Sequence, residues 1–520
     1  MSSLKFGTAG LRAPVGSGPD KMNVSTVTRA TAGVAAWMKK KLPSKHADGR
    51  YYVAVGYDAR YGSHTLARAA AETFAGAGFG VTLIADPVAT PVLAWLVRNR
   101  NLDAGVQITA SHNPAPDNGY KLYVDGGMQL LSPADTDIEE EIAKQPAAHE
   151  IPRSEAKSID LAAQDGYATA ISALVATGEQ AVLRPRRTLK ILYTPMHGVG
   201  GESLESALRN CGFGDVNFVA SQRWPDPEFP TVEFPNPEEP GATDALLEEA
   251  ARLEPDLLIA LDPDADRCML GVKDPSAEKG YRMLRGDETG PLLARRVLAK
   301  RVASKKDKTK PVVATTVVSS QLLGAMAERE GWDYVETLTG FKHLARAAES
   351  RPGHLAFAYE EAIGTCPSPS VVADKDGVAT ALIAAAWAAE LKEEGRSLLD
   401  ELADIEVTYG AYRTAQVAKR CTSADAASHA VAVFKQYPPK KLAGMTVAAS
   451  DIVDSSGRRA EGVRLTGEDG SLHLRVVARP SGTEPKAKFY LELHGPAEKA
   501  ADVEQRLEQL IQEIRNIEET

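Results

Sequence analysis

One plan of predicted strands and helices recurs three times along this chain of 520 residues. Each copy is expected to run strand, helix, strand, helix, strand, and the third strands span residues 104–109, 256–261 and 355–358. Strands that alternate with helices predict α/β units with largely parallel pairing. Open α/β sheets bind ligands at the carboxyl ends of their strands, so the polar loops that follow these three strands are candidate sites.

The first of these loops reads Thr109-Ala110-Ser111-His112-Asn113-Pro114. Asn-Pro favours an extended or turn conformation, and Asn118-Gly119 predicts a second turn. Ser111 is therefore expected at the tip of a strand, on an exposed loop. Serines are common in turns, so Ser111 alone is weak evidence for chemistry.

The second loop carries Asp262, Asp264 and Asp266, directly after the apolar strand 257–261. Aspartates at every second residue point the same way in an extended segment. Their carboxylates repel one another unless a cation lies between them, and hard oxygen ligands suit Mg²⁺. An EF-hand loop is excluded, because Arg267 stands where that loop needs glycine.

These two loops together suggest phosphoryl transfer. A phosphorylated Ser111 would supply a further anionic ligand to a magnesium ion held by the aspartates. Lys121 is a candidate acid/base group at a sugar hydroxyl, provided that burial or cationic neighbours lower its pKa.

Two later segments are candidate substrate contacts. Arg479, Ser481, Gly482 and Thr483 offer a guanidinium, two hydroxyls and accessible amides, a combination that binds a phosphate dianion. Glu360 and Glu361 end the third strand of the last α/β unit and are candidates for pairing with sugar hydroxyls, although a solvated strand end fits them equally well.

Composition narrows the classes of protein. The 60 basic and 70 acidic residues give a net charge of −10 with no long basic run, which argues against nucleic acid as a partner. The four cysteines are scattered, as expected of reduced thiols in a cytoplasmic protein. The apolar run 381–389 is too short to cross a membrane, and the first residues do not resemble a signal peptide.

The four loops together resemble those of the α-D-phosphohexomutase superfamily, and the resemblance covers nearly the whole chain. Ser111 matches the phosphoserine of the family's T-A-S-H-N-P loop, and the three aspartates match its magnesium loop. Residues 359–364 match its sugar-specificity loop, and residues 479–485 match its phosphate loop.

This resemblance implies three successive α/β/α domains with mixed sheets around a central cleft, followed by a C-terminal α+β domain like the TATA-binding protein. We expect a phosphoserine-loop domain over residues 1–185 and a magnesium-binding domain over 186–305. A sugar-specificity domain should then span 306–405 and a phosphate-binding domain 406–520.

The resemblance also implies residue roles. Ser111 is the phosphoryl carrier, Arg12 and Lys121 assist acid/base chemistry, and His112 orients the serine loop. Arg267 supports the metal loop, and Thr339, Gly340 and Lys342 contact the sugar.

Within the family, the chain looks most like a branch that holds bacterial phosphoglucomutase/phosphomannomutases, eukaryotic phosphopentomutases and a sugar-bisphosphate synthase. Ala362 stands where many members have serine, and Gly364 stands where bacterial members often have histidine. Lys375 is the candidate that replaces this missing acid/base histidine.

The expected reaction interconverts glucose 1-phosphate and glucose 6-phosphate, with mannose phosphates as further substrates. A sugar 1,6-bisphosphate is the intermediate, Mg²⁺ the cofactor and glucose 1,6-bisphosphate the activator. The expected partner is a small sugar phosphate rather than nucleic acid or membrane, and the chain is expected to be a monomer or homodimer. The alternatives are a phosphopentomutase, a sugar-1,6-bisphosphate synthase and a silent phosphosugar-binding protein.

Overall fold

The contacts within this computed structural model divide the chain into two units, which are described separately. The structure describes residues 4–7, 10–159, 162–177, 179–304, 309–481 and 485–517. The first unit comprises residues 1–285 and 362–398, and the second comprises 286–361 and 399–520. The division into four domains at the boundaries given above stays a prediction.

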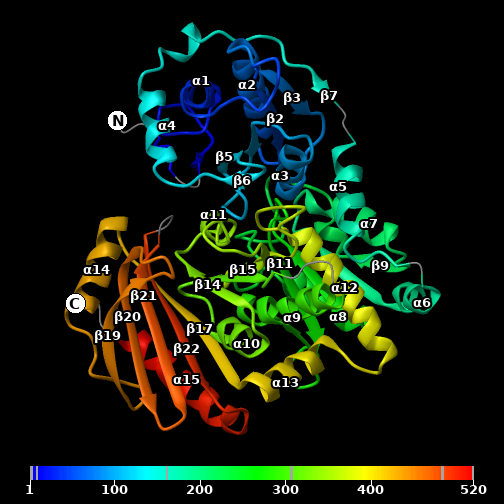
Figure 1. Cartoon of the computed structure of the whole chain (residues 1–520), viewed down its shortest axis with the longest axis vertical. Coiled ribbons are helices and arrows are strands. Elements are labelled where there is room, and N and C mark those ends of the chain that lie inside the picture. The colour runs from blue at the N-terminus through cyan, green and yellow to red at the C-terminus, as the bar shows by residue number, and fades with distance from the viewer. Residues whose placement is uncertain are drawn as a thin grey trace. The chain divides into compact units, whose positions relative to one another are not determined.

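The first sheet of the first unit is mixed. Strand β2 pairs in parallel with β3 and β4, whereas β5 pairs antiparallel with β4 on one side and with β1 on the other. Figure 1 shows these strands in blue and cyan. The strand order is β1 (Leu11–Pro14), β5 (Asp117–Val124), β4 (Ala104–Ile108), β2 (Tyr52–Tyr57), β3 (Gly80–Ile84) and β7 (Ser158–Ile159), with β6 (Met128–Gln129) beside β5.

Helices pack against this sheet. Side chains of α1 (Val24–Lys41), α2 (Ser63–Gly76) and α4 (Ala134–Ala143) share one apolar core with alternate residues of β2, including Val53 and Val55. Helix α3 (Thr90–Asn99) contacts β2 and β4, and α5 (Ala163–Ser172) packs on α3. Asn23 caps α1 by accepting a hydrogen bond from the Thr26 amide, and lysines fill the last turn, as a helix C-terminus favours.

The turn predicted at Asn118-Gly119 is wrong, because both residues lie in β5. The Asn118 side chain donates hydrogen bonds to the Tyr61 carbonyl and the Ser63 hydroxyl. A Cβ on Gly119 would lie 2.4 Å from the Thr109 carbonyl oxygen, so glycine serves close strand approach here rather than a turn.

The second sheet of the first unit is also mixed. Strands β8, β9 and β10 are parallel, and β11 and β12 continue the sheet antiparallel. Helix α8 shares an apolar core with this sheet, while the almost wholly buried α12 contacts β10, β11 and α7. The elements are β8 (Lys190–Thr194), β9 (Asp215–Phe218), β10 (Leu257–Leu261), β11 (Cys268–Lys273), β12 (Tyr281–Met283), α6 (Gln180–Thr188), α7 (Gly200–Asn210), α8 (Asp244–Leu253) and α12 (Gly377–Glu393). The first unit also includes β16 (Gly364–Cys366), which is not a strand of this sheet.

In the second unit, β13 lies between two parallel neighbours, β14 and β15. Helix α9 packs on β15, and α10 packs on β14. The elements are β13 (Val312–Thr316), β14 (Asp333–Thr337), β15 (Leu355–Glu360), α9 (Gly286–Ser304), α10 (Leu322–Glu330), α11 (Phe341–Leu344) and α13 (Leu398–Tyr409).

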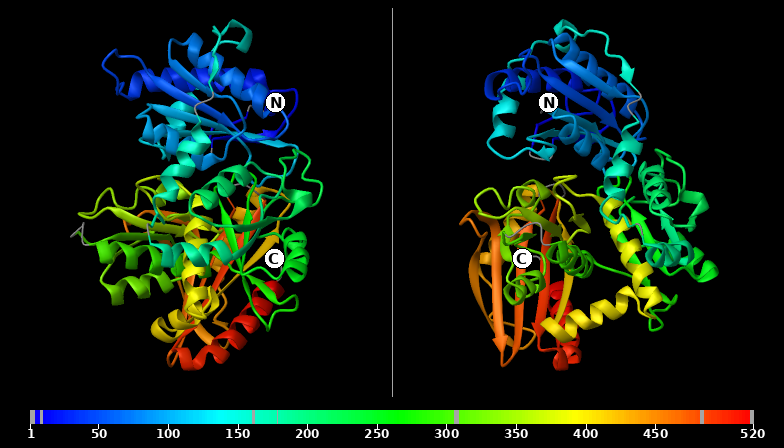
Figure 2. Two further views of the ribbon diagram at one scale, coloured as in Figure 1. Left: turned by 90° about the vertical axis from the view of Figure 1, so that its right-hand side faces the viewer. Right: turned by 45° about the vertical axis from the view of Figure 1, so that its right-hand side comes forward.

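The second unit ends in an antiparallel sheet whose first strand, β17, pairs with its last strand, β22. Side chains of α14 and α15 form one core with this sheet, and Figure 2 shows α15 in red beside the orange strands. The order is β17 (Ala411–Arg420), β22 (Lys486–Gly495), β21 (Leu472–Pro480), β20 (Arg459–Asp469), β19 (Met445–Val453) and β18 (Lys441–Leu442), with α14 (Ala424–Gln436) and α15 (Ala500–Asn516).

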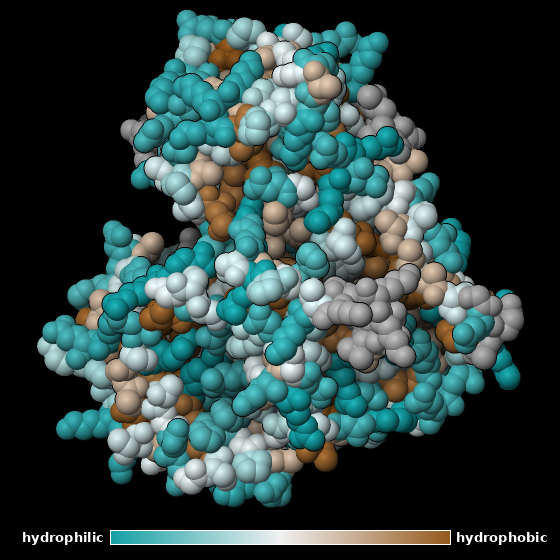
Figure 3. All heavy atoms as spheres, viewed as in Figure 1, coloured by the Kyte–Doolittle hydropathy of each residue, from teal (hydrophilic) through white to brown (hydrophobic). Residues whose placement is uncertain are grey.

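The repeated plan of strands and helices is thus confirmed, as is the change to a β-rich region near the C-terminus. Within the described residues, we find no helix that combines the length and the apolar character needed to cross a membrane. On the face of the molecule shown in Figure 3, hydrophobic residues form separate small groups among hydrophilic ones.

Candidate active site

Ser111 follows β4 and adopts a left-handed conformation, with φ of 54°. Its amide donates to the Thr109 hydroxyl at 2.9 Å, and its own hydroxyl donates to Asp262 Oδ2 at 2.9 Å. His112 Nδ1 lies 3.1 Å from the same hydroxyl. The exposed loop expected here is wrong, because only 2% of Ser111 is accessible once the aspartate loop packs over it.

A buried arginine holds the serine loop from behind. Arg60 donates to the carbonyls of Ser111 (2.6 Å), Asn113 (2.5 Å), Pro114 (2.9 Å) and Asp117 (3.1 Å). A guanidinium suits this task because its donors form a rigid fork. The backbone that carries Ser111 is therefore fixed by one side chain.

The aspartate loop follows β10 as a turn, in which the Ala265 amide donates to the Asp262 carbonyl. The extended segment predicted for it is wrong, since Ala265 has φ of 55°. The carboxylates still converge, with one oxygen from each of Asp262, Asp264 and Asp266 within 4.8 Å of the others. All three side chains are buried.

Two buried lysines pair with these carboxylates. Lys121, on β5, places Nζ 2.6 Å from Asp264 Oδ2 and 3.0 Å from Asp266 Oδ2. Lys375 places Nζ 3.1 Å from Asp266 Oδ2. Arg267 approaches Asp266 Oδ1 at 3.9 Å. The predicted residues of the first unit thus share one charged cluster.

The titration of the cluster follows from burial and charge. Burial tends to lower the pKa of Lys121, but Asp264 and Asp266 outweigh it and raise that pKa above its ordinary value. The acid/base role of Lys121 was predicted on the condition that its pKa is lowered, and this condition is not met. Burial, with Arg267 and Arg12 nearby, lowers the pKa of His112 well below its ordinary value, so this imidazole is neutral at pH 7.

The oxygen atoms of the aspartate loop fit a divalent cation. Oδ1 of Asp264 and Oδ1 of Asp266 are buried and accept no hydrogen bond from any residue that the structure describes. A buried carboxylate oxygen without a partner is costly, and a hard cation with oxygen ligands removes this cost. Asp262, Asp264, Asp266 and the neighbouring Ser111 Oγ form a donor set of the kind Mg²⁺ prefers.

Arg12 lies on β1, opposite Gly119 of β5. Its Nη1 donates to Asn113 Oδ1 at 3.2 Å, which brings Arg12 to the serine loop. Burial lowers the pKa of Arg12, while Asp264 and Asp266 oppose that effect.

In the second unit, Glu361 is held by its own neighbours. Its Oε2 accepts from the hydroxyls of Thr316 and Ser319, each at 3.0 Å, and its amide donates to Ser319 at 3.2 Å. Glu361 therefore fixes the turn after β13, and Glu360 lies beside it at the end of β15.

The other predicted substrate residues of this unit lie at element ends. Thr339 and Gly340 precede α11, which contains Lys342, and Gly340 has φ of 106°. Arg479 lies on β21 opposite Lys488, and Ser481 follows that strand. Gly482 and Thr483 are outside the described residues.

Three residues of the site were missed from the sequence. Asp58 accepts a hydrogen bond from the Thr109 hydroxyl at 2.6 Å. Asp58 and Arg60 follow β2, so the rule that polar residues collect at carboxyl ends of parallel strands would have found them. Thr90 begins α3 and donates to Asp264 Oδ2 at 2.6 Å. No local pattern marks Thr90, because its partner lies far along the chain.

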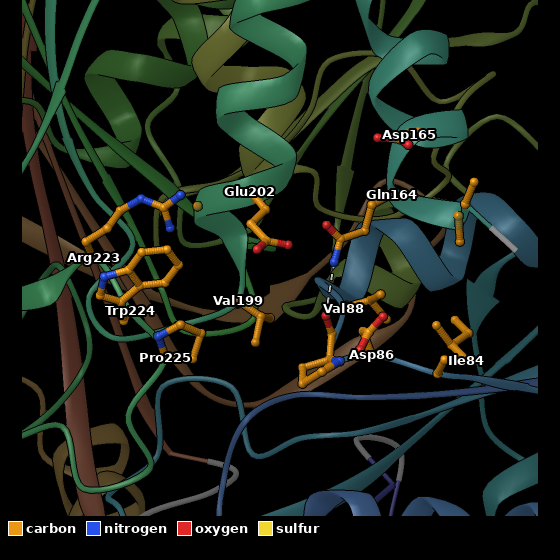
Figure 4. A pocket seen from close by; sticks show the side chains of 16 residues that line it. Ile84, Asp86, Val88, Gln164, Asp165, Val199, Glu202, Arg223, Trp224 and Pro225 are labelled. Carbon is orange, nitrogen blue, oxygen red and sulfur yellow. Dashed lines mark hydrogen bonds between the residues drawn. The ribbon is translucent and has the colours of Figure 1, made fainter. Parts of the chain in front are cut away.

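A cavity of about 510 Å³ opens in the first unit near the aspartate loop (Figure 4). Figure 4 shows Val88 and Val199 in the lining of this cavity, and Arg223 and Trp224 on the side of Val199 that faces away from Val88. The Val199 amide donates to the Pro263 carbonyl, so this wall also supports the aspartate loop. Among the described residues, the lining includes none that we predicted to be catalytic.

Comparison with known families gives four matches in sequence order. Three models described as phosphoglucomutase/phosphomannomutase alpha/beta/alpha domains I, II and III match residues 3–149, 165–276 and 285–407. The model described as the phosphoglucomutase/phosphomannomutase C-terminal domain matches residues 418–510.

Named relatives match nearly the full chain. A protein named probable phosphomannomutase from Haemophilus influenzae is 36% identical over 489 residues, covering 92% of this chain and 95% of that protein. A mouse phosphopentomutase is 32% identical over 533 residues, covering 95% and 84%. A phosphoglucomutase from Staphylococcus aureus is 30% identical over 536 residues, covering 98% and 93%.

Proposed function

Because this chain belongs to the phosphoglucomutase/phosphomannomutase family and is a sugar-phosphate mutase, we propose that it interconverts glucose 1-phosphate and glucose 6-phosphate. Mannose phosphates are the proposed second substrates, and a sugar 1,6-bisphosphate is the proposed intermediate. One observation carries the proposal: the Ser111 hydroxyl lies 2.9 Å from Asp262, at the edge of three buried carboxylates.

Ser111 is the proposed phosphoryl carrier. In the first half-reaction, the bond between Ser111 Oγ and phosphorus breaks as the free hydroxyl of the sugar phosphate bonds to phosphorus. This hydroxyl gives up one proton and Ser111 Oγ takes up one, so the step releases no net proton. The resulting bisphosphate turns over, and its other phosphoryl group returns to Ser111 while the sugar oxygen regains a proton. The same site thus serves both directions.

The surrounding residues hold charge and protons in this scheme. Lys121 and Arg12 carry positive charge beside the transferring group, which stabilises negative charge on phosphoryl oxygens. Lys121 is protonated in its ion pairs with Asp264 and Asp266, so we assign it the donation of a proton to the sugar oxygen. Neutral His112 orients the serine hydroxyl, and Lys375 is the further acid/base candidate.

Asp262, Asp264 and Asp266, with Ser111, are the residues proposed to hold Mg²⁺. The ion would supply Lewis-acid stabilisation of charge on the phosphoryl oxygens. Arg267 supports this loop, since its amide donates to Asp262 Oδ1 at 3.0 Å.

The second unit supplies the proposed substrate contacts. We assign Glu360, Thr339, Gly340 and Lys342 to the sugar, with Glu361 as the support of that loop. The loop of Arg479, Ser481, Gly482 and Thr483 is assigned to the phosphate that is not being transferred. Two phosphate contacts are what a bisphosphate intermediate requires.

The first test is the S111A variant. It should have no mutase activity, because the hydroxyl that takes the phosphoryl group is lost. The nearby hydroxyls of Thr90 and Thr109 are already engaged as donors to Asp264 and Asp58. Intact mass spectrometry of the wild type after incubation with glucose 1,6-bisphosphate should show a gain of about 80 Da, the mass of one phosphoryl group. Normal turnover by S111A would refute the role of Ser111.

The second test is a substrate panel of glucose, mannose and ribose 1-phosphates, each with a catalytic amount of glucose 1,6-bisphosphate. We expect the highest kcat/KM with glucose 1-phosphate. A preference for ribose 1-phosphate would favour the phosphopentomutase function named in the mouse relative. Formation of sugar bisphosphate only with an external acyl-phosphate donor would indicate a bisphosphate synthase instead.

A further inference from the structure

The two oxygens of the Asp264 carboxylate have different surroundings. Oδ2 accepts a hydrogen bond from the Thr90 hydroxyl at 2.6 Å and one from Lys121 Nζ at 2.6 Å. Oδ1 is buried and accepts none from the residues that the structure describes. The carboxylate is thus held by one oxygen, and the other oxygen remains for a further ligand.

Thr90 contacts Asp264 at two points. Besides the hydroxyl contact, the Thr90 amide donates to the Asp264 carbonyl at 2.9 Å. Thr90 is the first residue of α3, its exposed fraction is 0%, and Pro91 follows it. Proline in the first turn fixes the backbone there, so Thr90 is rigidly placed.

Lys121 alone does not fix the orientation of Asp264. Its ammonium is shared between Asp264 and Asp266, and a flexible four-carbon stem carries it. Rotation of the Asp264 carboxylate would exchange its two oxygens while keeping contact with the ammonium. The Thr90 hydroxyl opposes this exchange, because it approaches Oδ2 from a fixed helix start.

We propose that Thr90 is a positioning residue, whose hydroxyl turns Oδ1 of Asp264 toward the metal. The inference rests on the proposed function in one respect, namely that Asp262, Asp264 and Asp266 hold a divalent cation. It adds a residue outside the metal loop and outside the serine loop. Hydrogen bonds that orient carboxylate ligands typically change metal affinity by about 10–100-fold.

The test measures binding of Mn²⁺ to the full-length protein without sugar phosphate, by electron paramagnetic resonance of the free ion. T90V removes the hydroxyl and keeps the shape of the side chain, and we expect it to weaken Mn²⁺ binding at least tenfold. T90S restores the hydroxyl, so its Mn²⁺ binding should be weakened by less than about tenfold relative to the wild type, below the range of such effects. The Mg²⁺ concentration required for activity should rise clearly in T90V and much less in T90S. The KM for the sugar phosphate should change little in both variants.

T28V is the matched control. Thr28 is buried in α1, and its hydroxyl has no hydrogen-bond partner among the described residues. The same substitution there should leave Mn²⁺ binding unchanged. If T90V does not fold by circular dichroism, T90A takes its place, because alanine is compatible with a helix start and also lacks the hydroxyl.

The outcomes separate the two hypotheses. Weak Mn²⁺ binding by T90V that T90S restores supports the role of Thr90. Wild-type affinity in T90V, or equal loss in T90V and T90S, would overturn that role and leave the metal site intact. Absence of Mn²⁺ binding to the wild type would overturn the metal site itself, and the role of Thr90 with it.

Discussion

The hydrogen bonds of Arg60 lead to a first prediction, which concerns the rigidity of the serine loop. Its Nη1 donates to the carbonyls of Pro114 and Asp117, and its Nη2 donates to those of Ser111 and Asn113. A lysine at this position keeps the positive charge but has a single nitrogen. R60K is therefore expected to retain one pair of these contacts and lose the other.

The loss can be estimated from the hydrogen bonds alone. A hydrogen bond from a charged donor contributes about 1.5 kcal/mol or more, so two lost bonds weaken the loop by about 3 kcal/mol. That free energy corresponds to a roughly hundredfold increase in the equilibrium constant for opening. The buried ion pair with Asp58, 3.4 Å away, keeps a positive partner in R60K and is left out of the estimate.

Hydrogen exchange measured by mass spectrometry is the appropriate assay, because it reports local opening. The amides of Asn113 and Asp117 are bonded within the loop and should exchange about a hundredfold faster in R60K. Amides of β21, in the second unit, should not change. Mutase activity of R60K should fall together with the protection of the loop against hydrogen exchange, because the loop holds Ser111 in a left-handed conformation.

R68K is the matched control for R60K. Arg68 is 61% exposed in its side chain and pairs with Glu72 on the surface, where ion pairs contribute little. Its substitution should leave exchange in the serine loop unchanged. Protection of Asn113 and Asp117 in R60K equal to that of the wild type would refute the assignment of Arg60 as the support of this loop.

Two further predictions concern packing and pH. G119A should lower the Tm, because the new Cβ would lie 2.4 Å from the Thr109 carbonyl oxygen. Relieving such overpacking costs about 1–3 kcal/mol of stability. An unchanged Tm would contradict this close packing. Burial, aided by the charges of Glu361 and Glu492, raises the pKa of Asp287 to about 7. The folded state then binds this proton more tightly than the unfolded state does, so Asp287 reduces stability progressively as pH rises from about 4 to 7. D287N removes this titration, so the Tm of D287N minus the Tm of the wild type should increase between pH 5 and pH 7.5. A difference in Tm that does not change with pH would contradict the raised pKa of Asp287.

The sequence allowed prediction of those features whose cause is local. Alternating strands and helices follow from residue periodicity, and this periodicity also places the polar loops at strand ends. The convergence of Ser111 with Asp262 is not local, and it was expected only because the serine loop and the aspartate loop occur together in one chain. Gly119 was misjudged, because a local turn signal was overridden by the pairing of β5 with β1, about a hundred residues away. The direction of the Lys121 pKa depended on which carboxylates surround it, which only the folded chain determines.

Substrate residues divide in the same way. The position of Glu361 at the end of a strand was readable, but its engagement by Thr316 and Ser319 was not, because those hydroxyls come from another strand and its turn. Thr90 likewise has meaning only through Asp264, which lies 174 residues further along the chain. Whether a residue supports a loop or is free to contact the substrate therefore depends on its long-range partners and not on its residue type.

The pairing of β17 with β22 has a consequence for synthesis on the ribosome. All ten residues of β17 pair with β22, whereas the strands from β18 to β22 each pair with the next along the chain. At about 5–20 residues per second, the roughly 65 residues between the two strands delay their pairing by about 3–13 s. During that interval β17 is an unpaired edge on a nascent chain, and its Arg413, Lys419 and Arg420 are the charges that oppose edge-to-edge association between neighbouring chains.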